Sequence, residues 1–232
     1  MLFQLLASGS GGNALLIKNG KASVLIDAGL PARELQSRLR HAGAEELGAI
    51  IISHEHVDHL RGAGPLARRL GVPLYINGPT HLAAWPILGR LPEVRRFEAG
   101  EPFEACGLSF LPFPTPHDAA FPVGFVVEGV LGIATDLGSL TPEVTERLFG
   151  LKGIIIEFNH DLEMLVKGPY PWPVKERIRG PLGHLSNEAA GRLLREVASA
   201  ELELVVLAHL SQTNNQPPLA LDTARRALGG RR

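Results

Sequence analysis

The sequence predicts an α/β protein built from two sheets packed face to face with helices outside them, or from one open α/β sheet. Short apolar runs alternate with helical patterns in the order strands, helix, strands, helices, in two similar halves. No stretch of serine, glycine or charge separates these halves as a linker. The composition is that of an ordinary globular protein, with 45% hydrophobic and 20% charged residues. We therefore expect one domain over residues 1–232.

The first half is expected to begin with strands and to continue with helices and strands in turn. Pro31 opens a helix in which Leu35 and Leu39 lie four residues apart on one face. Apolar runs bounded by glycine-rich turns predict the other elements. The expected strands are 3–6, 14–18, 23–26, 49–53 and 74–76, and the further helices are 65–70 and 80–85.

The second half shows the same alternation. Thr141 precedes Pro142 at the first position of a helix, and Ser186 is expected to cap a later one. The expected strands are 94–97, 108–111, 123–127, 132–135, 153–157 and 204–208. The expected helices are 142–148, 187–199 and 219–228, with a loop at 168–173 and a helical turn at 174–178.

Charge and cysteine content narrow the possible functions. The net charge of −1 gives no global basic field of the kind that marks many nucleic-acid binders, although a local basic strip is sufficient for binding. Cys106 is the single cysteine, which excludes a disulfide within the chain. The sequence shows no signal peptide and no apolar run long enough to span a membrane, so we expect a cytoplasmic protein.

A cluster of metal-binding residue types follows the expected strand 49–53. His54, His56, Asp58 and His59 lie within six residues. In an extended segment, residues two apart point to the same side, so His54 and His56 can approach one ion. Asp58 and His59 come after the expected bend and can face a second ion. Imidazole and carboxylate ligands suit zinc, iron or manganese.

The pattern His54-x-His56-x-Asp58-His59 resembles the signature of the metallo-β-lactamase superfamily. That resemblance implies a four-layer αβ/βα sandwich. Other positions of the family pattern are matched, each at an expected strand end, by Asp27, His117, Asp136 and His209. The resemblance spans nearly the whole chain.

The resemblance also implies a site for two divalent metal ions. Zinc is the expected metal, with manganese or iron as alternatives. The ligand set would be His54, His56 and His117 for one ion, Asp58, His59 and His209 for the other, and Asp136 as the bridge. The expected catalytic residues are Asp58, Asp27 and His184, acting with a metal-bound hydroxide.

Local motifs favour a phosphodiester as the substrate. His184 and Ser186 stand at a helix start, where a phosphate binds well, and resemble the His-Ser motif of ribonuclease Z-like phosphodiesterases. Segments 7–13, 157–161, 169–173 and 209–215 resemble the WalJ/YycJ branch, which is linked to 5′→3′ exonuclease activity on DNA. The sequence departs from that branch at Phe158, where alanine is expected, and at Gly12, where serine is expected.

Several residues outside the ligand set are candidates for substrate contact. The expected substrate-binding residues are His160, Ser186, Asn187 and Asn214. Tyr170 and Trp172 either stack on bases or pack a loop down. Lys175, Arg177 and Arg179 either line a phosphate track or form a solvated helix face.

Two other functions stay open at this point. One is a small-molecule hydrolase, such as a cyclic phosphodiesterase, thioesterase or lactonase, since this fold supports many substrates. The other is a diiron oxidoreductase, which the resemblance disfavours because those proteins usually have glutamate at the position of His56. The sequence leaves the oligomeric state open.

Overall fold

The computed structural model describes residues 1–44 and 46–229. Glu45 and residues 230–232, which belong to the expected domain 1–232, lie outside the described residues. The chain forms two compact units. Unit 1 comprises Met1–Pro112 and Ala119–Val123, and unit 2 comprises Phe113–Asp118 and Gly124–Arg232. The single domain expected from the sequence stays a prediction.

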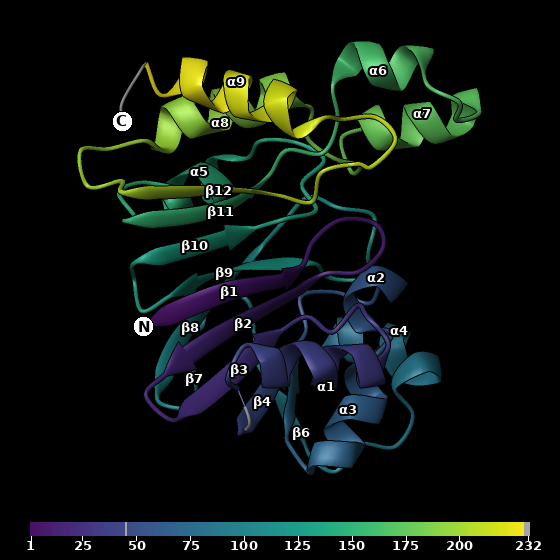
Figure 1. The fold of residues 1–232 in the computed structure, drawn as a ribbon, viewed down its shortest axis with the longest axis vertical. Helices are drawn as coiled ribbons and strands as arrows, with labels where there is room; N and C mark the ends of the chain where they lie inside the picture. Colours follow the sequence, from purple (N-terminus) through teal and green to yellow (C-terminus); the bar gives the residue numbers. More distant parts are fainter. Residues whose placement is uncertain (45, 230–232) are drawn as a thin grey trace. The chain divides into compact units, whose positions relative to one another are not determined.

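Unit 1 contains a mixed sheet of six strands in chain order (Figure 1). Strand β2 pairs antiparallel with both β1 and β3, whereas β4, β5 and β6 each run parallel to the strand before. In the central register, Leu25 pairs with both Leu16 and Ile50. The strands are β1 (Leu2–Ala7), β2 (Ala14–Asn19), β3 (Ala22–Ile26), β4 (Leu47–Ile51), β5 (Leu74–Ile76) and β6 (Val94–Arg96).

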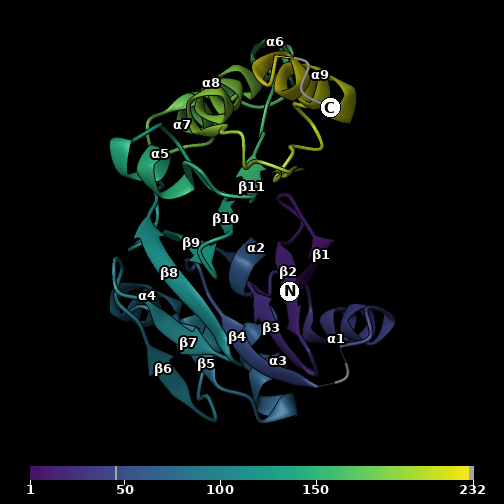
Figure 2. The same ribbon diagram turned by 90° about the vertical axis from the view of Figure 1, so that its left-hand side faces the viewer.

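Helices and sheet of unit 1 enclose one apolar core. Leu25 and Ile50 are fully buried in the sheet, as expected for parallel strands that are covered on both faces. Leu35 and Leu39 of α1 and Leu66 of α3 belong to the same core cluster. Helix α1 lies against β1 and α3, and α3 lies against β4 and α4 (Figure 2). The helices are α1 (Ala32–His41), α2 (Val57–Leu60), α3 (Ala63–Leu70) and α4 (Gly78–Leu88).

A tight hairpin joins β7 (Phe103–Ala105) to β8 (Leu108–Pro114). Cys106 and Gly107 form its turn and both have positive φ, 55° and 71°. Positive φ at both turn residues gives the turn a twist that matches the twist of the two strands it joins. Cys106 therefore lies in the turn of a hairpin.

Unit 2 contains strands in the order β12-β11-β10-β9. Strand β9 is antiparallel to β10, whereas β10, β11 and β12 are parallel. Because parallel strands end at the same edge of a sheet, the residues after Ala134, Ile156 and Ala208 gather there. The strands are β9 (Val123–Val127), β10 (Leu131–Ala134), β11 (Gly153–Glu157) and β12 (Leu204–Ala208).

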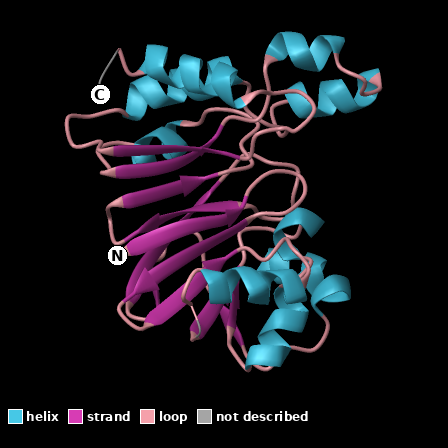
Figure 3. Ribbon diagram, in the orientation of Figure 1, coloured by secondary structure: helices cyan, strands magenta, loops and turns pink. Residues whose placement is uncertain are grey.

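Helices α5 and α8 of unit 2 also bury apolar side chains, among them Val144 and Leu193. Figure 3 shows the helices in cyan and the strands in magenta. Helix α8 packs against α5 and α9, and a Cβ at Gly191 would lie 3.1 Å from Thr223, so glycine allows the close approach of α8 and α9. Ser186 Oγ accepts a hydrogen bond from Ala189 N, which confirms the expected cap. The helices are α5 (Pro142–Leu148), α6 (Leu162–Lys167), α7 (Trp172–Arg179), α8 (Asn187–Val197) and α9 (Pro217–Ala227).

The sequence-based boundaries differ from the structure mainly around short elements. Strand β4 ends at Ile51, so the expected extension to residue 53 is wrong. The expected loop 168–173 is partly wrong, because α7 already begins at Trp172 after Pro171. Helix α6 was not expected, although Asp161 caps it by accepting from Met164 N. Within the described ranges, no helix has the length and apolar character needed to cross a bilayer.

Candidate metal centre

Three histidines of unit 1 lie together after strand β4. The ring centroids of His54 and His56 are 4.7 Å apart, and those of His54 and His59 are 4.1 Å apart. His54 and His59 are almost fully buried. The chain turns after His56 into the single-turn helix α2, which carries Asp58 and His59. The rings of His54 and His56 thus lie close together in the segment after β4, as the sequence led us to expect, and their binding of one ion stays a prediction.

Asp27 anchors this cluster from the end of β3. Its Oδ2 atom lies 2.7 Å from Nδ1 of His59, and both side chains are buried. Asp27 also accepts hydrogen bonds from the backbone N–H and the hydroxyl of Ser53. The carboxylate therefore fixes both the orientation of the His59 ring and the start of the histidine loop.

A second segment of unit 1 packs against Asp58 and His59 with little space to spare. Asn13 N donates to the carbonyl of Asp58, and Asn13 Nδ2 lies 2.9 Å from Nε2 of His59. A Cβ at Gly29 would lie 1.6 Å from the Asp58 carbonyl oxygen, so only glycine fits there. Asn13 was recognised in the sequence only as part of the segment 7–13, and Gly29 carried no signal.

In unit 2, Asp136 lies at the centre of three imidazoles. Its Oδ1 atom is 3.7 Å from Nε2 of His117, 3.6 Å from Nδ1 of His209 and 3.8 Å from Nδ1 of His184. His117 Nδ1 donates to the carbonyl of Gly183 at 2.9 Å. Burial lowers the pKa of His117, against the opposing charge of Asp136, which favours a neutral ring that can act as a ligand through Nε2.

Glu157 is a central residue of this cluster that the sequence did not reveal as such. The carboxylate ends β11 and is fully buried. Its Oε1 atom lies 2.7 Å from Nδ1 of His209 and 2.9 Å from Nδ1 of His184, while Oε2 accepts from the backbone N–H groups of Leu137 and Leu185. One carboxylate thus orients two histidines and two loops.

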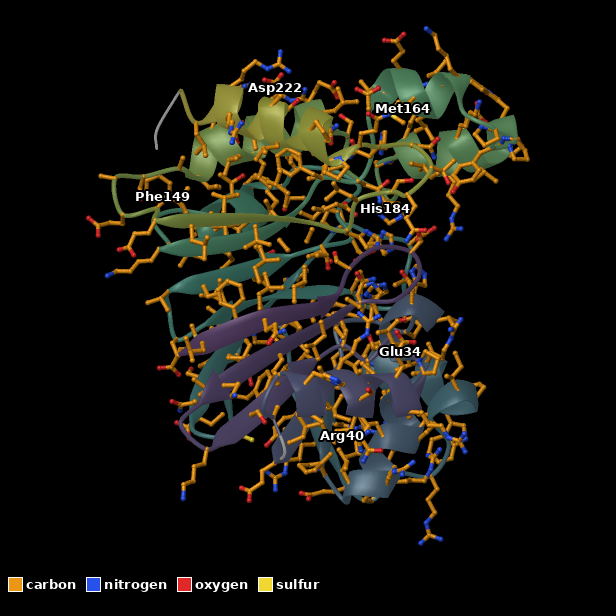
Figure 4. All side chains as sticks on the ribbon, in the orientation of Figure 1. Glu34, Arg40, Phe149, Met164, His184 and Asp222 are labelled. Carbon is orange, nitrogen blue, oxygen red and sulfur yellow. The ribbon has the colours of Figure 1, made fainter. Side chains whose placement is uncertain are left out.

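Glu157 and His184 shift each other's pKa in opposite directions. Burial alone would raise the pKa of Glu157, but the charge of His184 and the hydrogen bonds from His184 and His209 hold it well below its usual range. Burial alone would lower the pKa of His184, but the charge and hydrogen bond of Glu157, together with Asp136, raise it. His184, whose side chain is 22% exposed, is therefore suited to give up a proton to a neighbouring group. Figure 4 shows its side chain among the loops of unit 2.

The remaining expected substrate-binding residues have different surroundings. The Asn187 amide is buried and hydrogen-bonded with that of Asn215. Asn214 and His160 are each 1% exposed, and their side-chain nitrogen and oxygen atoms have no hydrogen-bond partner among the described residues. Lys175 Nζ donates to the carbonyl of Val166, which does not fit a phosphate track.

Backbone conformation is unusual at three of these positions. Asp27, Asp136 and His209 have φ of 60°, 60° and 54°, a region that non-glycine residues rarely adopt. Each follows a strand end. Such conformations cost roughly 1–3 kcal/mol each and tend to cluster at functional sites.

The donor set suits a divalent metal ion. Four candidate ligand histidines direct Nδ1 to an oxygen atom: His54 to Ser53, His59 to Asp27, His117 to Gly183 and His209 to Glu157. Metal-ligating histidines usually have such a partner for one ring nitrogen, which directs the other nitrogen to the ion. In unit 2, ligand atoms of Asp136, Glu157, His184 and His209 all lie within 4.8 Å of one another.

Comparison with known families agrees with these features. The model of the β-lactamase superfamily domain matches residues 22–210. The chain is 34% identical over 225 residues to exodeoxyribonuclease YycJ of Bacillus anthracis, covering 94% of this chain and 85% of that protein. It is also 34% identical over 227 residues to exodeoxyribonuclease WalJ of Streptococcus pneumoniae, covering 94% and 84%.

Solved structures support the same fold. The metallo-β-lactamase fold protein YhfI from Bacillus subtilis matches with a TM-score of 0.74 at 18% identity, covering 97% of this chain and 92% of that one. Human tRNase Z, short form, matches with a TM-score of 0.63 at 18% identity, covering 90% and 93%. The predicted α/β sandwich of the metallo-β-lactamase type is confirmed by these likenesses and by the mixed sheets.

Proposed function

The chain belongs to the metallo-β-lactamase superfamily and is a metal-dependent hydrolase, and on that premise we propose that it is a dinuclear phosphodiesterase acting as a 5′→3′ DNA exonuclease. The main support from the structure is the shared orientation of four histidines, each with Nδ1 directed to an oxygen atom. The nuclease activity is supported by the names of the relatives at 34% identity.

The proposed ligands are those expected from the sequence. One ion would be held by His54, His56 and His117, the other by Asp58, His59 and His209, with Asp136 as the bridge. Two divalent ions at such a site would lower the pKa of a shared water and stabilise negative charge on the substrate. Zinc is the proposed metal, with manganese or iron as alternatives, because imidazole and carboxylate suit all three.

Residues beyond the ligands would prepare the site for chemistry. Asp27 keeps the His59 ring in place through the contact at 2.7 Å, and Glu157 keeps the His209 ring in place in the same way. Asp27 and Asp58 are proposed catalytic residues, and Asp58, which precedes His59, is also a proposed ligand. His184, whose pKa is raised in the presence of Glu157 and Asp136, would donate a proton to the leaving oxygen of the phosphodiester.

Substrate contact is proposed for a further group of polar residues. The proposed residues are His160, Ser186, Asn187 and Asn214. Ser186 and Asn187 follow His184 closely in sequence, and Asn214 follows His209. His160 forms an isolated parallel β-bridge with Ser186. DNA is the proposed partner, and the cytoplasmic location stays a prediction.

A substrate panel tests the proposal directly. The purified protein, loaded separately with zinc or manganese, would be given duplex DNA, single-stranded DNA, RNA, bis-p-nitrophenyl phosphate and a thioester. We expect DNA carrying a label at one end to lose nucleotides stepwise from its 5′ end. Hydrolysis of the thioester alone would overturn the phosphodiesterase proposal.

A further inference from the structure

A cavity in unit 2 is lined by His184 and by other residues, none of which is a proposed metal ligand. Its volume is about 360 Å³. Four segments contribute to it: the loop after β10, the start of α6, the end of α7 and the start of α8. The polar side chains that line it are Ser139, His160, Arg179, His184, Ser186 and Arg192.

Two arginines give the cavity a positive character. Arg179, near the end of α7, and Arg192, on α8, are both exposed and both line it. Neither has an ion-pair partner within residues 1–44 and 46–229, in contrast to Arg177, which pairs with Asp118 at 2.6 Å. No acidic residue lies among the described residues that line the cavity. An anion would therefore meet two guanidinium groups without a competing carboxylate in the lining.

His160 supplies the second observation, from the buried side of the cavity. The residue is 1% exposed, and neither ring nitrogen has a hydrogen-bond partner among the described residues. A buried polar group without a partner costs roughly 1–3 kcal/mol. Burial also lowers the pKa of His160 to about 4, so the ring is neutral at pH 7 and keeps one N–H to donate. A ligand with acceptor oxygens would satisfy that donor.

Helix α8 adds a favourable field at the same place. Ser186 and Ala189, both at its N-terminus, line the cavity. The helix has 11 residues, and the N-terminus of such a helix carries a partial positive charge that attracts anions. The positive end of α8, the two arginines and His160 thus act on the same volume.

We propose that this cavity is a binding subsite for a phosphate group of a nucleotide, separate from the phosphate that is cleaved. A phosphate monoester has a charge between −1.5 and −2 at pH 7 and three strong acceptor oxygens, which matches two guanidinium groups and an imidazole N–H. The cavity is larger than a phosphate requires, and Leu140, Leu162 and Leu185 in its lining offer apolar contact to a sugar or base. His184, the proposed proton donor, also lines this cavity. The biological role of the subsite therefore rests on the proposed nuclease function.

Phosphate binding can be measured without any turnover. Inorganic phosphate and thymidine 5′-monophosphate would be titrated calorimetrically into the metal-loaded protein and into protein stripped with a chelator, which removes binding to the ions. We expect Arg192→Gln to weaken binding by about tenfold in both forms, since it removes a charge-assisted hydrogen bond. His160→Phe should weaken binding as well, because phenylalanine keeps a ring but has no N–H.

The matched control is Arg195→Gln, which removes an exposed arginine one turn further along α8. It should bind phosphate as the wild type does, and thermal unfolding would verify that all variants are folded. Equal affinity in Arg192→Gln, Arg195→Gln and wild type would overturn the subsite. So would stripped wild-type protein that is folded but binds no phosphate.

A second pair of measurements separates the sources of the phosphate. If the subsite holds the terminal phosphate of a DNA chain, a 5′-phosphorylated oligonucleotide should have a lower KM than the unphosphorylated one, and Arg192→Gln should abolish that difference. If the subsite holds a released mononucleotide, Arg192→Gln should instead weaken product inhibition. Phosphate binding in a protein that cleaves no DNA would overturn the proposed nuclease and leave the subsite intact.

Discussion

Nδ1 of His209 lies 2.7 Å from Oε1 of Glu157, and both side chains are buried. Because the pKa of Glu157 is held well below its usual range, its carboxylate is ionised and can only accept, so His209 must donate from Nδ1. The lone pair of a neutral His209 ring then resides on Nε2, the nitrogen that a metal would use. Asp27 has the same relationship to His59 in unit 1, also at 2.7 Å.

Replacing this carboxylate should weaken metal binding without removing a proposed ligand. The substitution Glu157→Gln removes the negative charge and replaces one carboxylate oxygen by an N–H₂ group. This new donor faces groups that themselves donate, namely the two histidine Nδ1 atoms and two backbone N–H groups. We expect metal affinity to fall by about 10- to 100-fold, as for other groups that orient metal ligands. Competition with a chromophoric chelator measures it. Glu163→Gln, on the exposed side of α6, is the control, and equal affinities in both variants would contradict the role of Glu157.

Gly29 should tolerate no side chain. In Gly29→Ala the new Cβ meets the Asp58 carbonyl oxygen at 1.6 Å and Asn13 N at 2.6 Å, so two backbone segments must separate. We expect the free energy of unfolding to fall by about 3 kcal/mol or more, because the clash is with backbone and not with a movable side chain. Chemical denaturation measures this, with Gly11→Ala as the matched control, since a Cβ there has no atom within 4 Å. Similar stabilities of the two variants would show that the segments are less tightly packed.

His184 should affect cleavage more than metal content. The raised pKa suits a proton donor to the leaving oxygen, a role worth roughly 10²- to 10⁴-fold in rate. We expect His184→Ala to cleave DNA at least 100-fold more slowly and to bind metal as the wild type does. Metal analysis and steady-state rates on the same samples test both statements, and His41→Ala on α1 controls for loss of an exposed histidine. Loss of metal from His184→Ala would mean that His184 acts as a ligand.

His160 should make the protein less stable in acid. The folded protein keeps this ring neutral down to about pH 4, whereas the unfolded chain takes up a proton near pH 6.5. Its contribution is therefore fully present above pH 6.5 and is lost as the pH falls toward 4, by about 3 kcal/mol at most. His160→Gln should show a shallower loss of stability between these pH values in phosphate-free buffer. Identical pH dependence in variant and wild type would contradict a buried, neutral His160.

Much of the fold follows from local sequence patterns. Strands β9, β11 and β12 begin and end where the apolar runs predict them. The runs of β9 and β11 are fully buried inside the sheet, whereas β12 is an edge strand and is only partly buried. Ser186 was recognisable as a cap from its position before an amphipathic segment. Helix α6 was missed because its six residues lie between the glycine- and proline-rich segment and β11, and only Asp161 indicates its start.

The site was only partly predictable for a physical reason. His54, His56 and His59 are close in sequence, so their spacing alone indicates a cluster. The contacts of Glu157 are with His184 and His209, which are 27 and 52 residues away in sequence. Glu157 and His209 meet at the ends of parallel strands, and His184 comes from the loop before α8. The positive φ of Asp27 and Asp136 is also hard to predict, since aspartate adopts this conformation more often than most residues but the sequence does not show which aspartates do so.

Cleavage of a 5′-labelled DNA duplex by the wild type and by Asp136→Ala, both reconstituted with the same metal, tests the central claim most directly. Asp136 lies within 3.8 Å of three histidines in unit 2, and it is the proposed bridge between the ions. We expect the wild type to release nucleotides from the 5′ end and Asp136→Ala to lose that activity. Cleavage by Asp136→Ala at the wild-type rate would contradict a dinuclear metal-dependent nuclease.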